Sequence, residues 1–150
     1  MTTPETVPSP KLTYIAVSAA LLVPVLIWPL FWWQGGGLNP GLDIAAIWRL
    51  AAATLLLSAI AVDSVLNFRY DHLSPFFAAG WVLFGTLAVS TALRLENGDF
   101  LIACLFAMHA LRSASRLWQH DTSWWLWPAW CRDSLAALGM FIWLYLLSHA

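Results

Sequence analysis

Residues 100–118 read FLIACLFAMHALRSASRLW, and the fold of the chain depends on whether this segment crosses a membrane. Its first half is apolar, but His109, Arg112 and Arg116 follow in the second half. An Arg at the centre of a membrane helix costs about 2.5–3.5 kcal/mol, whereas a Leu or Phe gains only about 0.3–0.6 kcal/mol. Arg112 lies about 9 Å along the helix axis from Trp118, however, so its long side chain can reach the membrane interface. We therefore predict that the segment spans the membrane, with a helix lying in the interface as the alternative.

Four further apolar segments flank this one, and each supplies the roughly 20 residues that cross the hydrocarbon core of a bilayer. They cover residues 12–33, 44–68, 75–95 and 127–148. Typical helix-start signals precede the first three, at Ser9-Pro10, Asp43 and Ser74-Pro75. The connections are short, so consecutive helices should be antiparallel neighbours. The sequence predicts an all-α integral membrane protein, a compact bundle of five transmembrane helices.

The composition of the 150 residues agrees with this fold, because 61% are hydrophobic and only 10% are charged. Soluble domains carry about 45–50% apolar and about 25% charged residues, which excludes a soluble or disordered chain. The net charge is −1 and no polybasic run occurs, so nucleic acid is not an expected partner. Cys104 and Cys131 form no CxxC pair and predict neither a disulfide framework nor a zinc site. We expect residues 12–149 to form a single transmembrane bundle after a mobile N-terminal tail at residues 1–11.

The distribution of basic residues predicts the orientation of the bundle. The N-terminal side carries five of them: Lys11, Arg69, Arg112, Arg116 and Arg132. The opposite side carries only Arg49 and Arg94, which we interpret as interface anchors with carboxylate partners nearby. By the positive-inside rule the N-terminus should be cytoplasmic, in a plasma (inner) membrane of bacterial type.

One group of polar residues could carry chemistry. His109, Arg112 and Arg116 are spaced i, i+3 and i+7, so they share one face of a helix that should point into the bundle. Candidate counter-charges at similar depth come from the neighbouring spans. The predicted ionic cluster, a binding site or a structural network, comprises Asp63, His109, Arg112, Arg116, Arg132 and Asp133. We expect Asp63 to pair with Arg112. Buried ion pairs often fix helix register without chemistry, so the structural interpretation is preferred.

Tryptophan is the second unusual feature, with 11 in the chain. Five crowd the connection between the last two spans: Trp118, Trp124, Trp125, Trp127 and Trp130. Tryptophan favours the headgroup level of a bilayer, so a simple aromatic belt explains most of them. The number exceeds what two belts need, which leaves a docking face for a subunit, lipid, quinone or pigment as a further hypothesis.

No recognised catalytic, phosphate-binding or metal-binding motif occurs, and no cofactor is predicted, although a bound lipid, quinone or pigment stays open. Membrane lipids and other membrane subunits are the expected partners, and a homo-oligomer is an alternative. We expect an accessory or assembly subunit of a larger membrane complex rather than an enzyme. The alternatives are a homo-oligomeric transporter or channel that uses the ionic cluster, and a membrane enzyme that acts on a lipid or quinone.

Overall fold

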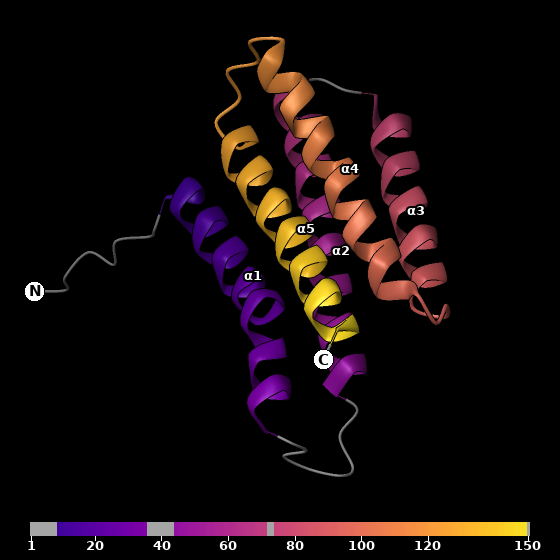
Figure 1. Cartoon of the computed structure of the whole chain (residues 1–150). Helices are drawn as coiled ribbons and strands as arrows, with labels where there is room; N and C mark the ends of the chain where they lie inside the picture. The colour runs from indigo at the N-terminus through magenta and orange to yellow at the C-terminus, as the bar shows by residue number, and fades with distance from the viewer. Residues whose placement is uncertain (1–8, 36–43, 72–73, 150) are drawn as a thin grey trace, which may run out of the picture.

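A computed structural model describes residues 9–35, 44–71 and 74–149 and folds them into a bundle of helices (Figure 1). The helices are α1 (Pro10–Gly35), α2 (Ile44–Asp71), α3 (Pro75–Ala92), α4 (Gly98–Trp118) and α5 (Leu126–Ser148). Each end lies within three residues of its predicted position, and all five are long and apolar enough to cross a membrane. The predicted five-helix membrane bundle is confirmed.

Helix α4 packs along other helices of this bundle (Figure 1). It lies antiparallel beside α5 and also packs against α2 and α3, so the interfacial alternative does not describe it (Figure 1). Helix α1 packs against α2 and α5. We call the end that holds the starts of α1, α3 and α5 the Tyr14 end, and the opposite end the Arg49 end.

The helix starts follow the sequence signals where the structure describes them. The hydroxyl of Ser9 accepts a hydrogen bond from the backbone N–H of Leu12 and caps α1. Ser74 precedes Pro75 at the start of α3, although its side chain makes no capping bond. Helix α1 already includes Pro10 and Lys11, whereas residues 1–8 of the predicted tail and Asp43 lie outside the described residues.

Helix α1 continues through Pro29, and two tryptophans satisfy the backbone there. Proline has no N–H, so the carbonyl of Val25, four residues earlier, loses its helical partner. The indole N–H of Trp48 donates to that carbonyl at 2.8 Å. The indole N–H of Trp143 donates to the next carbonyl, that of Leu26, at 2.7 Å. An unpaired carbonyl is costly in lipid, so these indole hydrogen bonds stabilise the helix near Pro29. They also connect α1 to α2 through Trp48 and to α5 through Trp143.

Glycines allow the closest approaches between elements. A Cβ on Gly85 of α3 would lie 2.6 Å from the side chain of Ile60 on α2. A Cβ on Gly98 would collide with the backbone carbonyl of Ala92, so the tight turn between α3 and α4 requires glycine. The core in the middle of the bundle is apolar, and Phe106 and Met140 are fully buried there. Close packing of this kind is a main source of helix association in lipid.

Candidate functional site

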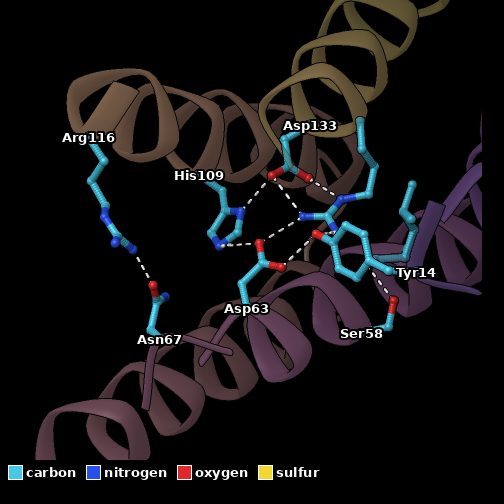
Figure 2. A network of polar contacts seen from close by, with 9 residues as sticks. Tyr14, Ser58, Asp63, Asn67, His109, Arg116 and Asp133 are labelled. Atoms are coloured by element: carbon cyan, nitrogen blue, oxygen red, sulfur yellow. Dashed lines mark hydrogen bonds and ion pairs between the residues drawn. The ribbon is translucent and has the colours of Figure 1, made fainter. Parts of the chain in front are cut away.

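The centre of the site is a chain of ionic contacts between α4 and α5 (Figure 2). The Nδ1 atom of His109 lies 2.7 Å from Oδ2 of Asp133. Asp133 also accepts two hydrogen bonds from Arg132, at 2.8 Å from Nε and at 3.0 Å from Nη2. Consecutive residues on a helix point about 100° apart, so the long Arg132 side chain turns back to reach its neighbour. One carboxylate therefore holds both basic groups in place.

Asp63 of α2 and Tyr14 of α1 complete this arrangement. Arg132 donates from Nη2 to Oδ2 of Asp63 at 3.0 Å, and from Nη1 to the Tyr14 hydroxyl at 3.0 Å. The Tyr14 hydroxyl donates in turn to Oδ1 of Asp63 at 2.8 Å. We call Tyr14, Asp63, His109, Arg132 and Asp133 the buried network. It joins α1, α2, α4 and α5 at one level of the bundle.

Burial makes the charges of the buried network strongly dependent on one another. Asp63, His109 and Arg132 are only 3–4% exposed, and Asp133 is not exposed at all. Removing a charge from water costs several kcal/mol even after relaxation, so each must be balanced by its neighbours. The carboxylates of Asp63 and Asp133 meet Arg132 and the ring of His109 inside the bundle, so these polar groups bond one another and do not face lipid.

Arg112 and Arg116 lie outside this network. The guanidinium of Arg112 stacks on the ring of Trp81, 4.7 Å from the ring centre. Arg116 donates to the Asn67 side chain and to Asp121 in the α4–α5 connection. The predicted pairing of Asp63 with Arg112 is therefore wrong, because Asp63 bonds Arg132 instead. The predicted cluster of six divides into four buried members and two outer arginines.

One nitrogen of the buried network lacks a partner. Nε2 of His109 makes no hydrogen bond within the part of the chain that the structure describes, and it lies 4.0 Å from Oδ2 of Asp63. A cavity of about 10 Å³ is lined by His109 and Asp63 together with Asn67, Arg112 and Ser113. Its volume is about that of one water molecule and its lining is mainly polar.

The same residues resemble a metal site in part. Asp63, His109 and Asp133 each offer a ligand atom, and these atoms lie within 4.8 Å of one another. Arg132 donates to both carboxylates, however, so a divalent cation would have to displace its guanidinium and would leave that charge unpaired. The chemistry of the donor set favours an ion-pair network over a metal centre.

The predicted tryptophan face divides between surface and interior. Trp118 and Trp127 are exposed, at 86% and 60%. Trp125, by contrast, is only 2% exposed, so its side chain cannot form part of a docking surface. Trp130 packs edge-on to Trp127 with ring centres 5.6 Å apart. Trp124 packs edge-on against Tyr14 of the buried network, with ring centres 5.6 Å apart.

A second ionic group lies at the Arg49 end. Arg49 of α2 donates from Nε and Nη2 to the two carboxylate oxygens of Asp99, at 2.8 and 3.0 Å. It also donates to the carbonyls of Leu95 and Glu96 in the turn between α3 and α4. This bidentate pair fixes the turn to α2, so Arg49 is more than an interface anchor. We call it the outer bridge.

Two grooves open on the outside of the bundle. The α1/α2 groove has a volume of about 570 Å³ and includes Tyr14, Arg69, Trp124 and Arg132 in its lining. The α2/α3 groove has a volume of about 650 Å³ and no charged residue in its lining. Its lining residues are Ala61, Ser64, Val65, Phe68, Pro75, Ala78, Ala79, Val82, Leu83 and Thr86. The first groove therefore has charged residues in its lining, whereas the second has none.

Sequence reasoning missed Tyr14, Trp81 and Asp121. Tyr14 stands alone in an apolar segment, and its depth, three residues after Lys11, is the only signal that it could meet the other polar residues. Trp81 packs with its ring nearly parallel to that of His109, with ring centres 6.3 Å apart. Nothing in the sequence distinguishes it from a lipid-facing tryptophan.

The fold and site define a small polytopic membrane protein with a buried ionic network. Comparison with known proteins adds no family: no family model, no curated protein and no solved structure matches the chain.

Proposed function

We propose that the protein is an accessory or assembly subunit of a larger membrane complex, and that the α2/α3 groove receives a transmembrane helix of that complex. The observation that carries this proposal is the lining of the groove, which holds no charged residue and is built from helices α2 and α3 with several small side chains. Small side chains let a further helix approach closely, and close packing is a main source of helix association in lipid.

The shape of the groove supports the same occupant. Ala61, Ala78 and Ala79 supply small side chains along it, and small residues allow two helix backbones to approach closely. Neighbouring Gly80 is exposed and has nothing within 4 Å of its Cβ position. Helix α3 therefore presents a surface of small residues that none of the other described helices covers.

The arrangement of charge favours a supporting role over transport. Arg132 of the buried network bonds both Asp63 and Asp133 near the Tyr14 end. The described core between this network and the outer bridge is apolar and includes Leu55, Phe106 and Met140. A solute path would need polar side chains along this stretch, so the transporter alternative is less well supported. The excess of basic residues at the Tyr14 end further supports our proposal of a cytoplasmic N-terminus in an inner membrane of bacterial type.

A groove-filling substitution tests the proposal. Ala79→Leu should block the α2/α3 groove, whereas Leu87→Phe, on the exposed face of α3 outside the groove lining, is the control. After extraction in mild detergent, the wild type and L87F should run as one complex with the same second protein in fixed stoichiometry. The A79L variant should run as the free chain, with an unchanged unfolding transition in intrinsic tryptophan fluorescence.

A photo-crosslinking residue at Val65, inside the groove, should give an adduct with that second protein, and one at exposed Ile142 should give none. A wild type that runs only as a single chain would overturn the proposal. An adduct of Val65 with a second copy of this chain would overturn it in favour of the homo-oligomer. A complex that survives A79L would exclude the groove as the docking site.

A further inference from the structure

We infer that the α1/α2 groove binds one chain of an anionic phospholipid, with the phosphate at the Tyr14 end. The two charged residues of the groove lining, Arg69 and Arg132, lie toward the Tyr14 end, and only Ser18 and Ser58 are polar farther along the groove. Thr13 and Tyr14 lie in the first turns of α1, Arg69 lies near the end of α2, and Trp124 lies in the α4–α5 connection. Antiparallel helices bring these residues to the same level, and the rest of the lining is mainly apolar.

The length of the groove matches one leaflet of a bilayer. Its lining on α2 extends from Leu55 to Arg69, which corresponds to roughly 20 Å at about 1.5 Å per residue. The hydrocarbon core is about 30 Å thick, so one leaflet is about 15 Å deep. A lipid chain in the groove would therefore lie beside Val62 and Leu55 while its headgroup stays at the level of Arg69.

The charges at the polar end are complementary to phosphate. Arg69 lines the groove, and the ammonium of Lys11 lies over the Trp124 ring, 5.7 Å from its centre. The carboxylate of Asp63 bonds Tyr14 and Arg132. An anionic headgroup at this end would lie near the positive charges of Lys11 and Arg69.

Arg132 offers a further donor to this lipid. Guanidinium has five N–H groups. Hydrogen bonds to Asp63, Asp133 and Tyr14 use four of them: one on Nε, one on Nη1 and two on Nη2. The remaining Nη1 donor belongs to a side chain that is 4% exposed and lines the groove. An uncharged acceptor such as an ester carbonyl of the lipid suits this donor.

Lipid retention in defined vesicles tests the inference. Purified protein is reconstituted with phosphatidylglycerol or with phosphatidylcholine of the same acyl chains, extracted, and weighed by native mass spectrometry. The wild type should retain one phosphatidylglycerol in preference to phosphatidylcholine. Arg69→Gln should reduce that preference about five-fold, as expected for the loss of one cation near the headgroup. Val62→Phe, inside the groove, should remove both lipids, and Ile142→Phe on the exposed face of α5 should remove neither.

Three outcomes would overturn the inference. Equal retention of the two lipids by the wild type would exclude headgroup recognition. Unchanged retention by a folded V62F variant would place the lipid elsewhere. Protection of the protein against thermal unfolding by inorganic phosphate alone, to the same extent as by phosphatidylglycerol, would show a phosphate site that does not hold a lipid chain. None of these results depends on the α2/α3 groove or on a partner protein.

Discussion

The buried network and the outer bridge both use arginine and aspartate, yet their surroundings differ. In the outer bridge the side chains of Arg49 and Asp99 are 22% and 16% exposed, and the pair lies at helix ends where water and headgroups can compensate it. In the buried network the side chains of Arg132 and Asp133 are 4% and 0% exposed. The same two residue types should therefore contribute little to the stability of the fold in the outer bridge, whereas in the buried network they should be required for folding.

Removal of Arg132 should produce the largest effect. Arg132→Met leaves Asp63 and Asp133 both buried without their shared cation. Breaking a buried ion pair in this way costs about 3–5 kcal/mol. The free energy of unfolding, measured in mixed micelles by tryptophan fluorescence, should fall by that amount. At the other end, Arg49→Met is the matched control and should cost clearly less.

A second substitution separates charge from packing. The double variant with Arg132→Met and Asp63→Leu keeps only the close pair of His109 and Asp133. If unbalanced charge causes the loss, this variant should be more stable than R132M alone. A double variant no more stable than R132M would show that the side chain of Arg132 acts through packing, and the contrast between the two ends would then lose its electrostatic basis.

The sequence predicts the helices far better than the contacts between them. Span length and apolar content set the limits of all five helices, because a bilayer demands both. The partner of Asp63 depends on the rotation of α4 and α5 about their axes, which packing decides. The sequence places Arg112 and Arg132 at similar depth, and our prediction paired Asp63 with Arg112. In the structure Arg112 stacks on Trp81 and Asp63 bonds Arg132. The burial of Trp125 likewise depends on how the helices pack, and no local sequence pattern predicts it.

Within the buried network, Tyr14→Phe should have the next largest effect. It removes one hydroxyl that donates to Asp63 and accepts from Arg132, at 2.8 and 3.0 Å. Leaving such buried groups without a partner costs about 1–3 kcal/mol. The stability of Y14F should fall by that amount while the helical content, measured by circular dichroism, stays the same. A loss as large as that of R132M would mean that Tyr14 is required for the position of α1 as well as for this hydrogen bond.

Substitutions in the outer bridge should lower the free energy of unfolding by a smaller amount, and the effects of changing Arg49 and Asp99 should depend on each other. Arg49→Met and Asp99→Asn should each cost about 0.5–1.5 kcal/mol, the usual net contribution of a hydrogen-bonded contact. The double variant should cost little more than either single variant, because the two residues share one interaction. Additive losses would instead assign the stabilisation to the bonds of Arg49 with the carbonyls of Leu95 and Glu96.

The smallest expected effect is a dependence on pH in the connection between α4 and α5. Partial burial alone would raise the pKa of Asp121. The hydrogen bonds from Ser123 and the ion pair with Arg116 outweigh burial and hold this pKa below its ordinary value of 3.8. A carboxyl with a lowered pKa stabilises the fold when the pH is above its ordinary pKa, and this contribution disappears as the pH falls through the folded-state pKa.

Amide hydrogen exchange at residues 119–125 should therefore accelerate below about pH 4 in the wild type. In D121N it should already be faster at pH 7 and change little with acid, apart from the intrinsic effect of pH on exchange. A wild-type connection with no such acid response would show that Asp121 does not hold the α4–α5 connection in its folded conformation.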